Sequence, residues 1–469
     1  MRRAALASAF VALLAPIGAW AEIGTLDDVP AATLLLPYFE VDLDNPNGIT
    51  TLFSVNNAEA GPAIAHVTLW TDLAVPTLDF NVFLTGYDVV TFNLRDLFVA
   101  GTVPRTSHNQ TAVSPRGVYS LVTHPVSGVG PGSTSCNEQL PLPPLPATLL
   151  DHLRAAHTGH PSPVVFGGLK SGFLFCSDSI ARGYLTLDNA NFCSLRFPES
   201  CATGYFIAGG NGDANNLNQL WGDYFYVDGD QNFAQGETLV HLEASDALGA
   251  DHYTFYRRFC ANGEDQREGL GSTFAVRYVN GGAFTGGTDL LVWRDPKRPI
   301  APFSPALPYP APFLLGESQV VIFDEAENPD APPSCPFSPP NCSSASGPNK
   351  AILAAAKAGL AANRVRVGGS PLTLVHGRAA GGQPPCSVPG FPVPFDAGWL
   401  YLDLNTVVAG SQVPFEPITQ NFVSAVLSAN GRFSVGYDAV QLDNVTYPAQ
   451  ALDVQLPVCD GAPDPPACQ

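Results

Sequence analysis

The chain has 469 residues, of which 45% are apolar and only 14% are charged, and its formal net charge at pH 7 is −20. The apolar content is sufficient for buried cores, whereas the charged fraction lies well below the roughly 25% of an ordinary soluble domain. An acidic surface repels nucleic acid phosphates and anionic lipid head groups, so neither is expected as a partner.

The first 21 residues have the pattern of an export signal. Arg2 and Arg3 form a short basic start, residues 4–17 are largely apolar, and Ala19 and Ala21 are the small residues that flank a signal-peptidase cleavage site. We therefore expect an exported protein that is secreted, periplasmic or held at the cell surface, where disulfide bonds persist. No later apolar run reaches the roughly 18 residues of a membrane span.

Short strands dominate the prediction from residue 33 onward. Residues 49–55, 63–70, 78–84 and 89–94 alternate apolar side chains with polar or small ones, which places one face in a core and the other in water. Asn, Asp, Gly and Pro between these runs supply the turns. The spacing predicts a mainly β fold with two or three antiparallel β-sandwich-like domains and a few short connecting helices.

Two helices are expected, at residues 147–157 and 349–362, as connectors beside the sheets. Proline-rich runs form extended, semi-rigid links, so they mark candidate domain boundaries. After the signal peptide (1–21), the predicted division is an N-terminal β-sandwich-like domain (22–140), a central β-rich domain with one helix (141–298), a proline-rich, disulfide-stapled linker (299–348), and a C-terminal domain with a helix and strands (349–469).

The ten cysteines, an even number, predict a disulfide framework in an exported chain. Each bridge would contribute about 2–4 kcal/mol. A metal site is the rival interpretation, but no Cys-x-x-Cys sequence occurs. Spacing does not determine connectivity, and local pairing is the simplest scheme. The local pairs are Cys193 with Cys201, Cys335 with Cys342, and Cys459 with Cys468.

Two acidic turns predict calcium sites, because hard cations prefer clustered carboxylate and carbonyl oxygens. The second turn begins with the 1-3-5 spacing of a calcium loop, but Phe233 stands where an EF-hand requires glycine. The alternative is that Asp, Asn and Gly simply form turns between strands. The candidate ligands are Asp42, Asp44 and Asn47 in the first turn, and Asp228, Asp230, Asn232 and Glu237 in the second.

Other chemical signatures are weak. His152, His157 and His160 lie close in sequence, and His241 precedes His252, but no H-E-x-x-H motif occurs, so packing or solvated histidines are the favoured interpretation over zinc. Neither a G-x-S-x-G nucleophile elbow nor a phosphate-binding loop is present. Carboxylate pairs for glycoside hydrolysis come from separate strands and leave no local signature.

Aromatic and arginine residues in the β-like segments have two interpretations each. Exposed aromatic rings in a row would stack on sugars, whereas buried rings would fill a sandwich core, which is the interpretation favoured here. Arg95 and Arg294 end strand-like runs and are expected to make ion pairs or turn contacts. The tryptophans concerned are Trp70, Trp221, Trp293 and Trp399.

Taken together, these features favour a non-enzymatic extracellular or cell-surface binding or structural protein, with disulfide and calcium support. A polysaccharide or an envelope component is the expected partner, and the sequence predicts no oligomeric state. The alternative is an extracellular hydrolase that acts on polysaccharide, and a third option is a periplasmic component of an envelope assembly. A binding protein should show an exposed aromatic row or a flat polar face, whereas an enzyme should show a cleft with carboxylates of raised pKa.

Overall fold

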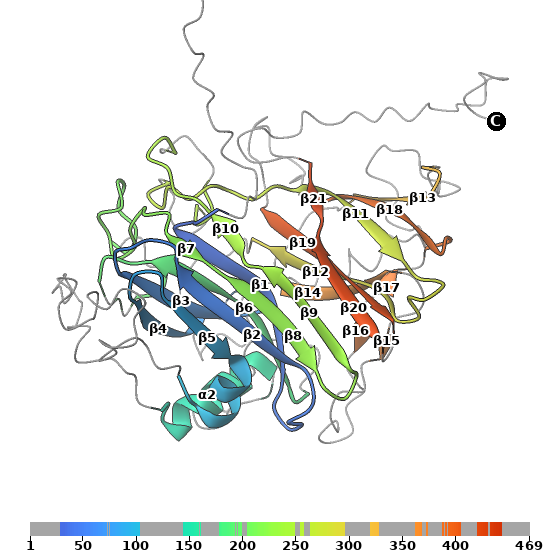
Figure 1. Cartoon of the computed structure of the whole chain (residues 1–469), viewed down its shortest axis with the longest axis horizontal. Helices are drawn as coiled ribbons and strands as arrows, with labels where there is room; N and C mark the ends of the chain where they lie inside the picture. Colours follow the sequence, from blue (N-terminus) through green and yellow to red (C-terminus); the bar gives the residue numbers. More distant parts are fainter. Residues whose placement is uncertain are drawn as a thin grey trace, which may run out of the picture.

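Figure 1 shows the computed structural model of the chain, which is mostly β and contains several antiparallel sheets, as predicted. No helix among the described residues is long and apolar enough to cross a membrane. The structure describes residues 29–72, 74, 76–103, 144–158, 160, 178–192, 194, 196–198, 204–248, 254–257, 263–295, 319–327, 362–367, 372–373, 387–388, 390–391, 393–404, 420–429 and 432–442.

Two sheets make up the N-terminal part of the fold. Sheet I has the strand order β10-β1-β6-β3-β4, and sheet II has the order β5-β2-β8-β9, with β7 also paired to β2. The strands of sheet I are β1 (Thr33–Asp42), β3 (Ala63–Thr71), β4 (Pro76–Leu84), β6 (Ile180–Asn189) and β10 (Val240–Leu242). Those of sheet II are β2 (Thr50–Asn57), β5 (Val89–Asn93), β7 (Leu220–Trp221), β8 (Asp223–Asp228) and β9 (Phe233–Thr238).

Two further sheets follow in the C-terminal part. Sheet III has the order β17-β14-β12-β19-β20 and sheet IV the order β13-β18-β11-β21, while β15 (Leu372–Thr373) pairs with β16 (Ser387–Val388). The strands of sheet III are β12 (Gly287–Arg294), β14 (Ala362–Val367), β17 (Gly390–Phe391), β19 (Asn421–Ala429) and β20 (Phe433–Asp438). Those of sheet IV are β11 (Thr273–Val279), β13 (Gln319–Asp324), β18 (Ala397–Asp403) and β21 (Val440–Gln441).

The local predictions agree with these elements. The four runs predicted between residues 49 and 94 form β2, β3, β4 and β5, and the first predicted helix forms α2 (Ala147–Thr158). A short π-helical turn, η1 (Asp96–Ala100), lies against α2, and α2 also contacts β6 and β4 of sheet I. The second predicted helix, residues 349–362, lies outside the described residues except for Ala362, which begins β14.

Strand β1 carries an irregularity that decides which way its later side chains point. The pairing with β6 shifts between Leu36, opposite Leu185, and Phe39, opposite Gly183. One extra residue on β1 is therefore accommodated beside Pro37. Proline has no N–H to donate to a neighbouring strand, so within a central strand it is found at bulges such as this one. A one-residue shift exchanges the two faces of a strand. Glu40 thereby comes to lie directly opposite Arg182.

Two apolar cores lie between the sheets. The larger core combines side chains of sheets I and II with Leu291, Trp293 and Phe422 of sheet III. The smaller core lies between sheets III and IV and includes Leu290 and Val292. Successive residues of β12 thus contribute to different cores, as the alternation of a strand requires. Sheet III is therefore a layer shared by both cores, which explains why every residue of β12 is buried.

The sheets are not confined to the segments divided at the proline-rich stretches. Sheet I joins β1, β3 and β4 to β6 and β10, which follow residue 140. Sheets III and IV join β12 and β11 to strands beyond residue 348, and β13 lies within the stretch 299–348 predicted as a linker. In addition, β9 of sheet II runs beside β20 of sheet III (Figure 1). Strand pairing thus crosses the predicted boundaries.

Candidate functional site

The two acidic turns predicted as calcium sites lie against each other. Because β2 pairs with β8, the turn that precedes β2 meets the turn that follows β8. The amides of Gly229 and Asp230 donate to the Asn47 carbonyl oxygen at 2.8 and 3.1 Å. The Asn45 side chain also donates to Asp230 Oδ2 at 2.7 Å. The structure thus brings together residues 42–48 and 228–230, which the sequence offered as separate candidates.

Many oxygens of the first turn already accept hydrogen bonds. Asp42 Oδ1 accepts from the amides of Asp44 and Asn45, both at 3.0 Å. The half-buried guanidinium of Arg95 donates to the carbonyl oxygens of Asp42, Asn45, Gly48 and Ile49. This is the turn contact expected for Arg95, and it places a positive charge among the carbonyl oxygens of the turn.

Not all predicted ligands of the second turn lie together. Asp228 Oδ1 accepts from the Gln231 amide at 3.1 Å, and Asn232 takes the left-handed conformation (φ +49°) that asparagine tolerates in turns. Glu237 pairs with Tyr224, whereas Asp228 pairs with Phe233 at the other end of the hairpin. Among the described residues, no three His, Cys, Asp or Glu side chains are grouped so that they could hold a metal ion.

Calcium support stays a prediction, and thermal unfolding tests it. If calcium binds at the turn pair, EDTA should lower the melting temperature and added calcium should restore it, because a ligand that binds only the folded state stabilises it. Metal analysis of the purified protein provides the parallel measurement. An unchanged melting temperature in a calcium-free protein would leave Asp42 and Asp228 as turn residues.

Replacing Arg95 by methionine should lower the free energy of unfolding by about 1–3 kcal/mol, because the carbonyl oxygens of the first turn lose a charged donor. Urea unfolding provides the measurement. Arg432→Met is the matched control, since Arg432 is exposed and surface substitutions usually change stability by less than about 0.5 kcal/mol. Equal unfolding midpoints for the two variants would contradict the stabilising role assigned to Arg95.

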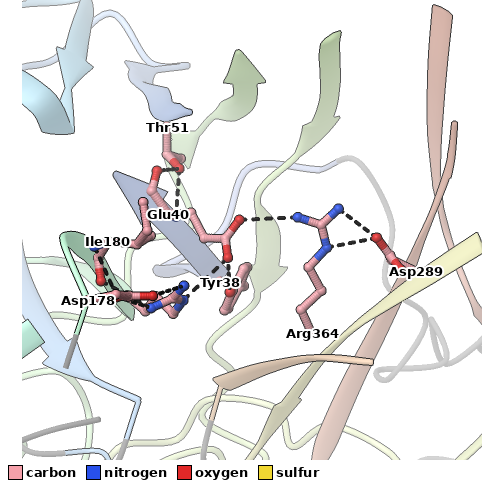
Figure 2. A network of polar contacts seen from close by, with 8 residues as sticks. Tyr38, Glu40, Thr51, Asp178, Ile180, Asp289 and Arg364 are labelled. Carbon is pink, nitrogen blue, oxygen red and sulfur yellow. Dashed lines mark hydrogen bonds and ion pairs between the residues drawn. The ribbon is translucent and has the colours of Figure 1, made fainter. Parts of the chain in front are cut away.

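A chain of alternating charges is buried between sheets I and III (Figure 2). Glu40 lies at its centre: Oε1 accepts from the Tyr38 hydroxyl at 2.6 Å and lies 3.4 Å from Arg182 Nε, while Oε2 accepts from Arg364 Nη1 at 3.2 Å. Arg182 continues to Asp178 at 2.8 Å. Arg364 continues to Asp289, whose Oδ2 accepts from Nε at 2.9 Å and from Nη2 at 2.6 Å.

The network is balanced in charge. Arg366 Nε lies 2.5 Å from Asp289 Oδ1, so three arginines face the carboxylates of Asp178, Glu40 and Asp289. Burial alone would lower the pKa of Arg364, but the charges of Asp289 and Glu40 raise it above its ordinary value. Because Glu40 is only 2% exposed, its carboxylate interacts with the neighbouring arginines. The network therefore serves to connect β1 and β6 to β12 and β14.

A second buried network holds loops against sheet I. The Asp188 carboxylate accepts from Thr33 Oγ1 at 2.5 Å, from Tyr205 at 2.8 Å and from Tyr256 at 3.1 Å. The fully buried Arg267 donates to Thr33 Oγ1 at 3.0 Å and lies over the ring of Phe206. These contacts attach residues 205–206, 254–257 and 263–267 to the face of sheet I that carries Asp188.

His157 is a packed, neutral histidine. Its Nδ1 lies 2.8 Å from the Arg182 carbonyl oxygen and its Nε2 lies 2.8 Å from Thr77 Oγ1. Because a carbonyl oxygen only accepts, Nδ1 carries the proton and Nε2 accepts from the threonine hydroxyl. The rings of Phe39 and Phe98 pack against it, and burial lowers the pKa of His157 to about 4. These contacts agree with the packing interpretation for this residue.

The tryptophans divide into two groups. Trp70 and Trp293 are buried at 1% and 2% exposure and both pack against the ring of Tyr184, at 5.7 and 5.9 Å between ring centroids. Trp221 and Trp399 are only partly buried. Core packing thus accounts for two of the four tryptophans considered in the sequence. Trp399 lies instead on the outer face of sheet IV.

Sheet IV presents aromatic rings on the side away from the smaller core. Along β18, Leu400 and Leu402 are buried in that core, whereas Trp399 and Tyr401 are half-buried on the opposite face. Because the pairings of β11 and β13 with β18 run without a shift, residues on this face form cross-strand rows. This aromatic face consists of Val321, Phe323, Trp399, Tyr401, Ala275, Arg277 and Val440.

One row of the aromatic face contains Phe323, Trp399 and Arg277. The Arg277 guanidinium lies 5.4 Å from the centroid of the Trp399 ring. Arg277 Nη2 also donates to Glu325 Oε1 and Oε2 at 2.8 and 2.6 Å, and both side chains are about half exposed. Gly398 allows β18 to lie close to β13 in this row, because a Cβ at that position would collide with the Phe323 carbonyl oxygen.

Comparison with protein-family models, with curated proteins and with solved structures finds no match for this chain. The function must therefore be inferred from the residues themselves. The disulfide candidates Cys193, Cys201, Cys335, Cys342, Cys459 and Cys468 lie outside the described residues, as do the other four cysteines. The disulfide framework stays a prediction.

The buried charge network was not predicted, although two sequence signals point to it. Glu40 is the single charge in the otherwise uncharged residues 33–41. Arg364 and Arg366 alternate with valines, so a strand places both on one face. Buried charges require partners, so an isolated charge in an apolar run indicates a hidden ion pair. No local sequence pattern indicates that the partner of Glu40 is Arg364, which lies 324 residues further along the chain.

Proposed function

We propose that this chain is an exported, disulfide-stabilised protein with a non-enzymatic binding or structural role outside the cytoplasm. The partly buried rings of the aromatic face carry the proposal, because apolar side chains that a core does not need indicate an interaction surface. The signal sequence at residues 1–21 supports export, and the ten cysteines fit an oxidising compartment. A polysaccharide or an envelope component is the proposed partner.

The use of charge inside the protein supports a binding role over a catalytic one. Glu40, Asp178 and Asp289 are paired with arginines. Burial raises the pKa of Asp265 to about 6, but this side chain is fully enclosed and accepts from the hydroxyl of Thr254 and the amide of Tyr256. A carboxyl group in that position does not meet a polymer at the surface. The polysaccharide hydrolase stays the alternative.

One experiment separates the two functions. The purified, oxidised mature protein is applied to an array of polysaccharides and envelope components, with calcium and with EDTA, while released reducing sugar is measured in the same wells. Binding without released sugar is the expected result. Released sugar above that of heat-denatured protein would replace the proposal with the hydrolase, and the absence of all binding would reject a role in binding these partners.

A further inference from the structure

We propose that the aromatic face of sheet IV is the binding site and that its ligand is a neutral, hydroxyl-rich polysaccharide. This inference rests on the proposed binding function and specifies its location and ligand class. The smaller core already has Leu400, Leu402 and Val276 on the inner side of the sheet. The rings of Phe323, Trp399 and Tyr401 on the outer side are therefore not required to fill that core.

The geometry of the face suits an extended sugar chain. Unshifted pairing across β13, β18 and β11 keeps the face regular, with Phe323 beside Trp399 in one row and Val321 beside Tyr401 in the next. The faces of aromatic rings carry negative electron density and attract the slightly positive C–H groups of a sugar ring. Rings in successive rows offer successive stacking positions along a polymer.

The polar groups on the face identify the ligand as hydroxyl-rich. Arg277 offers donors and Glu325 offers acceptors within one exposed pair, and a sugar hydroxyl can use both because it donates and accepts. The guanidinium already lies against the Trp399 ring, so a sugar stacked beside it is within reach of this pair. The site thus combines apolar contact with hydrogen bonding, as binding sites for small polar units commonly do.

Charge disfavours the competing partners. The pair formed by Arg277 and Glu325 has no net charge, and the chain as a whole has a net charge of −20. A polyanion would be repelled by this field, and so would a second copy of the chain. A neutral polymer pays no such cost, which is why the ligand assigned to the aromatic face is an uncharged polysaccharide.

Binding of defined polymers to matched variants tests the inference. The probes are a soluble neutral β-glucan, a neutral galactomannan and, as an acidic polymer, polygalacturonate, each titrated by calorimetry into the full mature protein. The variants are Trp399→Leu and Phe323→Leu, which keep an apolar side chain but remove the aromatic ring. The control is Phe225→Leu, since Phe225 is a 44% exposed aromatic residue on sheet II, outside the aromatic face.

We expect a neutral polymer to bind and each ring-removing variant to weaken binding about tenfold or more, while Phe225→Leu binds as the wild type does. If the wild type binds and the two variants bind equally well, the location is wrong and the proposed function stands. Binding of polygalacturonate alone rejects the ligand class. Absence of binding to every polymer rejects this inference and the polysaccharide form of the proposed function together.

Two measurements keep these outcomes separate from loss of folding or association. Circular dichroism and the unfolding midpoint of each variant establish whether that variant is folded. If a variant is not folded, Arg277→Gln replaces it, and the same tenfold weakening of polymer binding is expected. Sedimentation equilibrium measures association of the wild type. A dimer that Trp399→Leu dissociates would assign the aromatic face to a second copy of the chain and overturn the polysaccharide site.

Discussion

Replacing Glu40 by alanine should lower the free energy of unfolding by about 3–5 kcal/mol, because removing one partner leaves buried charges without compensation. Both carboxylate oxygens of Glu40 face arginines, Arg182 in sheet I and Arg364 in sheet III. The variant also removes the acceptor of the buried Tyr38 hydroxyl. Urea unfolding followed by circular dichroism and by tryptophan fluorescence measures the loss.

Glu325→Ala is the matched control for this variant. Glu325 also pairs with an arginine, Arg277, but both partners are about half exposed. An exposed pair is worth about 0–1 kcal/mol, so this variant should unfold close to the wild type. A loss below about 1 kcal/mol in Glu40→Ala would show that the buried network does not stabilise the junction between the sheets.

Acidification should destabilise the protein through His157. Its pKa is about 4 in the fold and 6.5 in an ordinary environment, with burial as the main cause. Above the ordinary value neither state binds the proton, so the full stability is present there. As the pH falls from 6.5 through about 4, the unfolded chain takes up a proton that the folded protein excludes. At about 1.4 kcal/mol per pKa unit, the loss is about 3 kcal/mol.

The measurement compares wild type with His157→Gln in urea unfolding at about pH 7 and about pH 4. The comparison is needed because Asp265 acts in the opposite direction. Burial raises its pKa from 3.8 to about 6, so its contribution to the free energy of unfolding is full at low pH and is lost as the pH rises through this range. Asp265 is present in both proteins and its effect cancels. If the variant loses as much stability on acidification as the wild type, His157 is not the group responsible.

The strands and the first helix were predictable because their signals are local. Alternation over residues 63–70 and 78–84 reports which face meets a core, and it gave β3 and β4 within two residues at each end. The pattern over residues 147–157 likewise corresponds to α2. Strand β1 is less evident, since both of its faces are buried and Pro37 interrupts it. Its bulge depends on the register with β6, which no local pattern encodes.

The candidate sites show the same division between local and long-range information. The acidic turns at Asp42 and Asp228 were recognisable from composition, but their contact depends on the pairing of β2 with β8. The aromatic face required three strands to be placed in order, with β13 and β11 on either side of β18. Trp399 and Trp293 both lie in strand-like segments of the sequence, and only the sheet arrangement separates the partly buried ring from the core ring.

The charge network has a consequence for the order in which the chain can fold. Arg364 follows Glu40 by 324 residues, so a growing chain contains Glu40 and Arg182 long before their third partner exists. Contacts between such distant residues slow folding, because a long loop must close before they form. Until β12, β14 and β19 arrive, the N-terminal sheets lack one of their covering layers. A fragment that ends before residue 362 should therefore remain aggregation-prone and dependent on a chaperone.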